Sequence, residues 1–167
     1  MALKIEKFIQ EMSQPDDNLI ALPTLREFRS TLRARIQEKL DLMWKHEDKG
    51  AWTRRLIPTW VSTPISSKMY SKRGSVRQLQ MISGHFQCNA FRHRTKQIGS
   101  PLCRHGCECD ESITHILLHC PHYSTQRDTL LSTLATHDLQ PSVRNMLIHE
   151  RATIATQTFL SSIDIGG

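Results

Sequence analysis

CRHGCECDESITHILLHC, residues 103–120, is the stretch that decides the fold of this chain. It holds four of the chain's five cysteines and three of its nine histidines. The best-spaced set of four is a C-x3-C pair, Cys103 and Cys107, followed by an H-x4-C pair, His115 and Cys120. Structural zinc sites bind the ion tetrahedrally with such Cys and His sets. The spacing predicts a closed CCHC zinc knuckle over residues 103–123, with no position left for a catalytic water.

Two of the four ligand positions have an alternative in the sequence. Cys109 competes with Cys107, and His119 competes with His115 because residues one helical turn apart can share a face. The apolar run 116–118 predicts a short buried helix, which favours His115 and leaves His119 to solvent or to a supporting contact.

Clustered cysteines can also arise without zinc, in two ways. A disulfide framework is typical of small secreted chains, but the first residues, MALKIE, contain no apolar signal core. Free thiols packed as small apolar groups are the second possibility. The density of the cluster favours zinc, and an intracellular location, nuclear or cytoplasmic, is the expectation that follows.

The net charge of +6 is unevenly distributed along the chain. Residues 1–48 hold 8 Lys/Arg and 9 Asp/Glu, residues 49–104 hold 11 and none, and residues 105–167 hold 3 and 7. A block this basic favours a polyanionic partner, RNA or DNA of low sequence specificity. A solvated face balanced in space by the acidic tail is the alternative.

The cations flanking the knuckle are the predicted centre of the nucleic-acid surface. Seven residues are predicted to bind nucleic acid: Arg92, Arg94, Lys96, Arg104, Lys72, Arg73 and Arg77. The aromatic residues of the same block, such as Trp52 beside Arg54 and Arg55, can stack on unpaired bases, although packing beneath an irregular segment is the favoured role.

Apolar spacing predicts a mainly α-helical, irregular module. We divide the chain into an N-terminal arm (1–22), an amphipathic helix (23–49), a basic helical or irregular segment (50–102), the knuckle (103–123) and C-terminal helices (124–167). The helix at 23–49 opens with a capping box, Thr24 to Glu27. Its stripe of Leu25, Phe28, Leu32, Ile36, Leu40 and Met43 predicts a core helix that docks on the rest of the protein.

An ordered set of short pieces between residues 20 and 160 resembles the segment that follows the reverse transcriptase and RNase H domains in polyproteins of non-LTR retrotransposons. The pieces are Leu42-Met43-Trp44, Gly50-Ala51-Trp52-Thr53, Leu56-Ile57-Pro58, Gln80-Met81-Ile82-Ser83-Gly84-His85, the basic stretch to Lys96, Ser100-Pro101-Leu102-Cys103, His115 to Pro121, and Arg127. The resemblance implies a zinc-binding knuckle that handles element RNA or target DNA during target-primed reverse transcription.

The chain departs from that family at several positions. Phe86 stands where a glycine is usual, Arg151 and Ala152 where a tryptophan is often found, and Cys109 is extra. The polymerase and RNase H carboxylates of the family are absent, and two-metal phosphoryl chemistry needs such a cluster. We therefore expect no enzymatic activity from this chain, although the parent family is an RNA-directed DNA polymerase.

The function expected from the sequence is that of a non-catalytic, zinc- and nucleic-acid-binding module. One alternative is a protein-interaction module in which zinc shapes a surface that docks on a reverse transcriptase or RNase H domain. A transposon relic without selected function is the other. No run approaches the length of a membrane span, so no membrane partner is expected.

Overall fold

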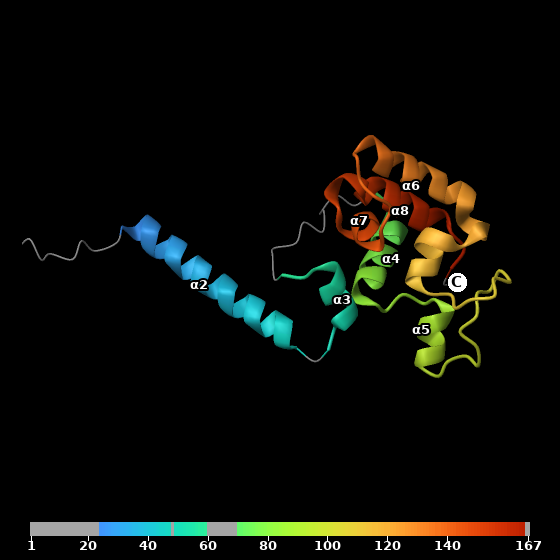
Figure 1. The fold of residues 1–167 in the computed structure, drawn as a ribbon, viewed down its shortest axis with the longest axis horizontal. Coiled ribbons are helices and arrows are strands. Elements are labelled where there is room, and N and C mark those ends of the chain that lie inside the picture. The colour runs from blue at the N-terminus through green and yellow to red at the C-terminus, as the bar shows by residue number, and fades with distance from the viewer. Residues whose placement is uncertain (1–23, 48, 60–69, 166–167) are drawn as a thin grey trace, which may run out of the picture. The chain divides into compact units, whose positions relative to one another are not determined.

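The computed structural model describes residues 24–47, 49–59 and 70–165. The predicted N-terminal arm lies outside these residues, as does most of the stretch between Pro58 and Tyr70. The chain divides into two units, residues 1–38 and 39–167, and the second contains the cysteine- and histidine-rich stretch 103–120. The described elements of the chain are helical, with one isolated antiparallel bridge, so the prediction of a mainly α fold is confirmed (Figure 1). No helix of the described residues combines the length and apolarity that crossing a bilayer requires.

Helix α2 runs from Leu25 to His46 and begins as the capping box predicts. The Glu27 amide donates to the Thr24 hydroxyl at 3.2 Å, and the Thr24 amide donates to the Glu27 carboxylate at 2.7 Å. Hydrogen bonds from Thr24 lower the pKa of Glu27 below its ordinary value, because they favour the charged carboxylate.

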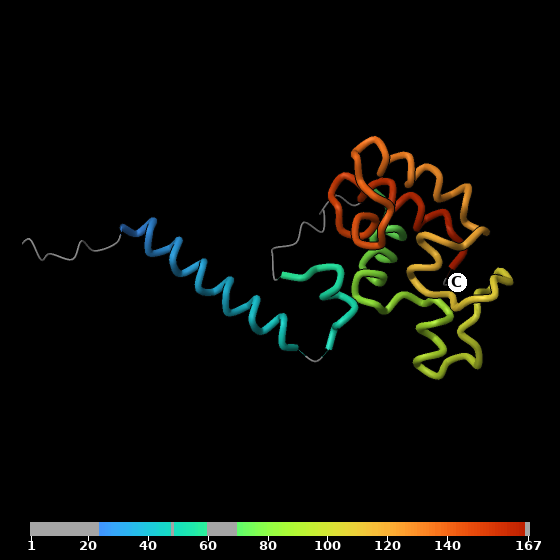
Figure 2. Tube along the Cα trace, in the orientation of Figure 1, coloured from blue at the N-terminus to red at the C-terminus, as the bar shows by residue number. Residues whose placement is uncertain are grey.

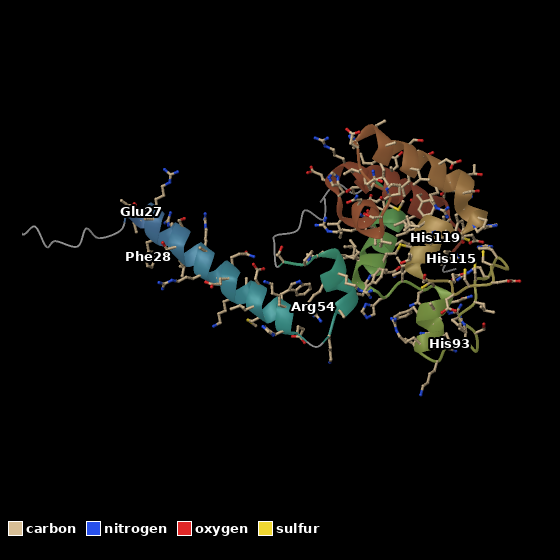
Figure 3. The ribbon with its side chains drawn as sticks, viewed as in Figure 1. Glu27, Phe28, Arg54, His93, His115 and His119 are labelled. Carbon is tan, nitrogen blue, oxygen red and sulfur yellow. The ribbon has the colours of Figure 1, made fainter. Side chains whose placement is uncertain are left out.

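Most of the apolar stripe of α2 belongs to the first unit, so its docking on the rest of the protein stays a prediction. The structure buries none of its residues, and Phe28, labelled in Figure 3, has an exposed fraction of 56%. Near the C-terminal end of α2, the Trp44 indole donates to the Ile57 carbonyl at 2.8 Å, which ties this end to the segment after α3.

The described part of the basic segment forms three helices. Helix α3 (Ala51–Leu56) follows Gly50, whose φ of 81° lies in the left-handed region. Helix α4 (Lys72–Ser83) begins at the Ser71 cap and ends at Gly84, and α5 (Asn89–Arg94) follows after a short turn. Gly84 ends α4 with a φ of 76°, and the chain turns from α4 into α5 (Figure 2).

The C-terminal part of the chain forms three helices, two of which pack against α4. A 3-10 turn (Pro121–Tyr123) leads into α6 (Ser124–Thr136), which is followed by α7 (Val143–Ile148), a second 3-10 turn (Glu150–Ala152) and α8 (Thr153–Ser162). One hydrophobic core joins them to the rest of this unit, with buried residues from Leu56 to Ile165. The separately predicted segments 50–102, 103–123 and 124–167 therefore share a single core, because each supplies too few apolar residues for its own.

Arg77 was predicted to bind nucleic acid, and the structure gives it a different role. Its side chain is 5% exposed, and its guanidinium donates to the carbonyls of Leu160 and Ile163 at 2.6 and 2.8 Å and also to that of Ile165. These carbonyls lie at and beyond the C-terminal end of α8, where a cation is favoured. Arg77 therefore holds α4 to α8 and is not available to a polyanion.

Gly74 lies where α4 passes close to the backbone of α8, and it generates the first prediction. A Cβ atom at this position would lie 2.3 Å from the Gln157 carbonyl oxygen, whereas one at Gly99 would meet nothing within 4 Å. We expect Gly74→Ala to lower the free energy of unfolding by about 1–3 kcal/mol, despite the better helix propensity of alanine. Gly99→Ala, the control, should change it by less than about 0.5 kcal/mol. Chemical denaturation measures both, and a stabilised Gly74→Ala protein would contradict this packing.

Candidate metal centre

The first pair of ligands lies on a tight backbone turn. Leu102 and Asp110 form the isolated antiparallel bridge, and the Cys103 amide donates to the Cys109 carbonyl at 2.9 Å. Inside this loop, the Gly106 amide donates to the Cys103 carbonyl at 3.1 Å, and Gly106 has a φ of 78°. Glycine adopts that conformation without strain, because it has no Cβ atom. The glycine before Cys107 therefore lets the turn close.

The second pair lies on either end of a π-helical turn, His115–His119. His115 is the first residue of this turn, and Cys120 follows its last residue directly. The Cys120 amide donates to the His115 carbonyl at 2.7 Å, an i to i+5 bond that brings the two ligand residues to the same side. Ile116 and Leu117 are fully buried in the core and anchor the turn. The short buried helix expected here is observed, but as a π-helix rather than an α-helix, since H-x4-C spacing suits the wider turn.

The four predicted ligands converge. One ligand atom from each of Cys103, Cys107, His115 and Cys120 lies within 4.8 Å of the others. The Cys120 sulfur is 4.0 Å from the sulfurs of both Cys103 and Cys107. Tetrahedral zinc with Zn–S bonds of about 2.3 Å separates its sulfur ligands by roughly 3.8 Å. The group therefore has the donor chemistry and nearly the spacing to hold a metal ion.

The two alternative ligands lie outside this group. Cys109 is exposed, and its sulfur lies 3.2 Å from Nδ1 of His115, so it is a neighbour of one ligand. His119 is exposed on the turn that carries His115 (Figure 3). In the described residues, the geometry therefore favours Cys107 over Cys109 and His115 over His119.

Glu111 fastens the stretch 103–120 to α5, a role that was not predicted from the sequence. Its carboxylate is 1% exposed and accepts two bonds of 2.8 Å from the Arg104 guanidinium and one of 2.9 Å from the Asn89 amide. Burial acts to raise the pKa of Glu111, but the bonds from Arg104 and Asn89 hold it below its ordinary value. Glu108 and Asp110 lie in the same stretch, and nothing in the sequence distinguishes Glu111 from them.

The ion pair with Glu111 also changes the role predicted for Arg104. Its Nε and Nη2 both donate to the buried carboxylate, and its side chain is 29% exposed. Two parallel bonds of this kind fix the guanidinium firmly. Arg104 therefore closes the loop between the first ligand pair and Glu111, rather than presenting a free cation.

Arg127 supports the other pair of ligands. It is buried, and its Nη2 donates to the carbonyls of Ile116 and Cys120 at 3.2 and 2.6 Å. These carbonyls belong to the π-turn and to the residue that ends it, so Arg127 binds the turn from α6. The resemblance included Arg127 without assigning it a role.

The protonation of the ligands makes metal binding dependent on pH. Loss of solvent and hydrogen bonds with neighbouring thiols raise the pKa of Cys107 to about 12, and burial raises the pKa of Cys120 as well. Burial lowers the pKa of His115, which favours the neutral imidazole that a metal binds. A metal must displace protons from the thiols, so its affinity falls as the pH falls.

The predicted nucleic-acid residues do not form one group. Arg92 and Arg94 lie in α5, and Lys96 follows directly with a φ of 60°. Lys72 and Arg73 are exposed in the first turn of α4, which places them about 15–17 Å along the helix from the end of α4 that leads to α5. Arg54 and Arg55 belong to α3, which packs on α4.

Comparison of the chain with protein-family models, with curated proteins and with solved structures gave no match. The resemblance to the retrotransposon segment therefore remains a prediction from the quoted residues.

The four-residue group generates the second prediction. Cys120→Ser should abolish stoichiometric metal binding, because Cys120 approaches both other cysteine sulfurs, whereas Cys88→Ser should retain it, since Cys88 is absent from the group. Elemental analysis of the purified variants measures the metal content. Loss with Cys109→Ser but not with Cys107→Ser would move the second ligand by two residues, and retention with Cys120→Ser would contradict the centre.

Proposed function

We propose that this chain is a non-catalytic module in which a zinc ion closes a CCHC knuckle and holds a basic surface for nucleic acid. The observation that carries the proposal is the convergence of Cys103, Cys107, His115 and Cys120 directly beside the acid-free segment. Three thiolates and an imidazole suit zinc, and four protein ligands leave no open position for chemistry. The metal would therefore be structural.

The basic surface is centred on α5. Arg94 and Lys96 are exposed, Arg92 is half-buried, and the segment from Lys49 to Arg104 contains no acidic residue. In the described residues, none of these three cations forms an ion pair, and the buried carboxylate of Glu111 is taken by Arg104. Unpaired cations next to a rigid knuckle favour phosphate contact, and the absence of a base-reading pattern favours low sequence specificity.

The resemblance to the retrotransposon segment gives this surface a biological setting. A segment of this kind beside a reverse transcriptase would hold element RNA or target DNA while synthesis is primed. This setting rests on the resemblance alone, whereas the zinc and polyanion proposals rest on the residues of the chain.

A second candidate function, docking on another protein domain, is favoured by α2. Its large apolar residues are exposed, with fractions of 76% at Leu25 and 56% at Phe28. A sustained apolar stripe on a helix is typical of protein contact. The two functions differ in salt dependence, since phosphate contacts release counterions and apolar docking does not.

The salt dependence of binding provides the third prediction. Arg92→Ala with Arg94→Ala should weaken binding to all nucleic-acid sequences and flatten the slope of log affinity against log salt by roughly 0.7–0.9 for each phosphate that is no longer neutralised. The matched control, Arg29→Ala with Arg33→Ala in α2, removes the same charge and should leave the slope nearly unchanged. Fluorescence anisotropy over a range of salt concentrations measures both.

Two outcomes would count against the α5 surface. Equal losses of affinity in both double variants would indicate attraction by net charge alone. No salt-dependent binding by the unaltered protein would rule out the nucleic-acid proposal and favour docking through α2.

A further inference from the structure

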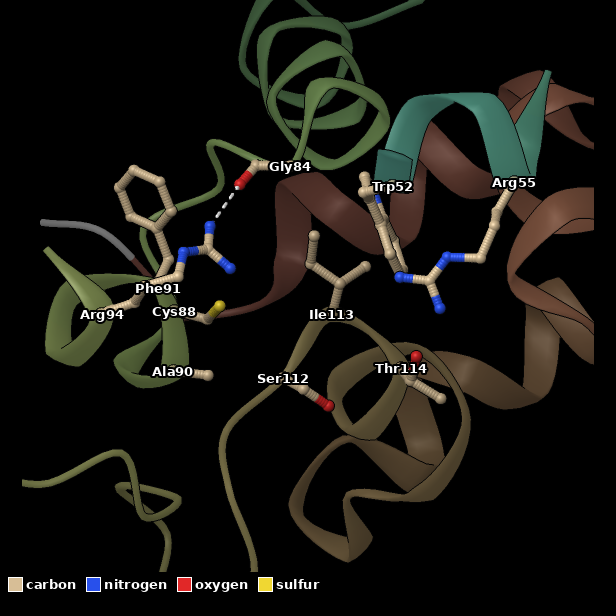
Figure 4. A pocket seen from close by; sticks show the side chains of 10 residues that line it. All are labelled: Trp52, Arg55, Gly84, Cys88, Ala90, Phe91, Arg94, Ser112, Ile113 and Thr114. Carbon is tan, nitrogen blue, oxygen red and sulfur yellow. Dashed lines mark hydrogen bonds between the residues drawn. The ribbon is translucent and has the colours of Figure 1, made fainter. Parts of the chain in front are cut away.

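A pocket of about 170 Å³ lies between α3, α5 and the loop that precedes the π-turn. Trp52 and Arg55 of α3 line one side, Phe91 and Arg94 of α5 the other, and Ile113 projects between them (Figure 4). Ile113 and Cys88 are buried and give the pocket an apolar floor. Neither the metal ligands nor the cations Arg92 and Lys96 line it.

Each side of the pocket pairs an aromatic ring with a guanidinium. The Arg55 guanidinium carbon lies 5.4 Å from the centroid of the Trp52 ring, and that of Arg94 lies 5.3 Å from the centroid of Phe91. Trp52 is held in place by its indole, which donates to the Met81 carbonyl at 2.7 Å. The two walls are therefore prearranged, since each arginine already lies over its ring.

Both arginines keep donors for a ligand. Arg94 makes one long bond of 3.4 Å to the Gly84 carbonyl, and neither arginine forms an ion pair within the described residues. Both residues are exposed. The chemistry that matches apolar walls, aromatic rings and two unpaired guanidinium groups is a planar aromatic ligand that carries negative charge.

The volume of the pocket limits how large such a ligand can be. Pockets for drug-sized molecules measure roughly 300–1,000 Å³, so this smaller one has room for a single ring system. A base inside a duplex cannot enter, because it is stacked and paired, whereas an unpaired base can stack on aromatic and guanidinium planes. We infer that the pocket receives one unpaired nucleobase of a bound strand, with Arg55 and Arg94 contacting the phosphates on either side.

This inference rests on the proposed nucleic-acid function and adds to it a preference for unpaired strands. A packing role for Trp52 is the expectation from the sequence, and its indole bond to Met81 agrees with that role. The pocket gives the same ring a second role, because packing leaves part of it on the pocket wall.

The experiment fills the pocket without changing the charge. Ala90 lines the pocket from α5, so Ala90→Leu should occupy it while keeping every cation. The probes are a short oligothymidine strand, an abasic strand of the same length and a duplex. The unaltered protein should prefer oligothymidine to the abasic strand by at least about fivefold, as expected for one stacked base. Ala90→Leu should remove that preference and leave abasic and duplex affinities unchanged.

A pair of single-charge variants provides the independent check. Arg55→Ala should weaken oligothymidine binding more than duplex binding, whereas Arg92→Ala, outside the pocket, should weaken both alike. Thermal melting verifies that each variant folds, and Arg55→Ala decides the question if Ala90→Leu does not fold. Salt-dependent binding without any preference for oligothymidine over the abasic strand would contradict the role of the pocket as a base-binding site and would leave the proposed function standing. Absence of binding to all three probes would overturn both.

Discussion

The convergence of four ligand atoms is the constraint on which the knuckle depends. Cys103 and Cys107 come from a loop with few apolar residues, and without a metal the three sulfurs that meet around one point are held only by weak thiol hydrogen bonds. The binding free energy of a metal ion held there would also be folding free energy for this stretch. The fixed protein contacts on either side, Glu111 with Arg104 and Arg127 with the π-turn, orient the two ligand pairs toward that point.

Contacts within the protein also decide which cations remain unpaired and exposed. Of the seven predicted nucleic-acid residues, Arg77 is buried at the end of α8 and Arg104 is paired with Glu111. A buried or paired guanidinium is a structural group, because removing its partners would leave a charge unsatisfied. The basic surface that we propose is consequently smaller than the charge block in the sequence.

Local signals in the sequence predicted more of this structure than long-range ones. The capping box and the two ligand pairs each depend on residues a few positions apart. The buried roles of Arg77 and Glu111 were missed, because each depends on partners brought together by folding: the Leu160 carbonyl is 83 residues from Arg77, and the Asn89 amide is 22 residues from Glu111. The stripe of α2 shows a further limit of local signals, since periodicity reveals an apolar face but not what covers it.

Hydrogen exchange with and without a chelator tests the central claim, that a metal organises the knuckle within an otherwise helical body. Removing the metal should expose the amides of residues 103–120, including the Cys120 amide of the π-turn. The amides of α4 and α8 should remain protected, because their contact is made by Gly74 and Arg77 rather than by the ligands. Unchanged exchange in the knuckle, or loss of protection throughout the chain, would contradict the account.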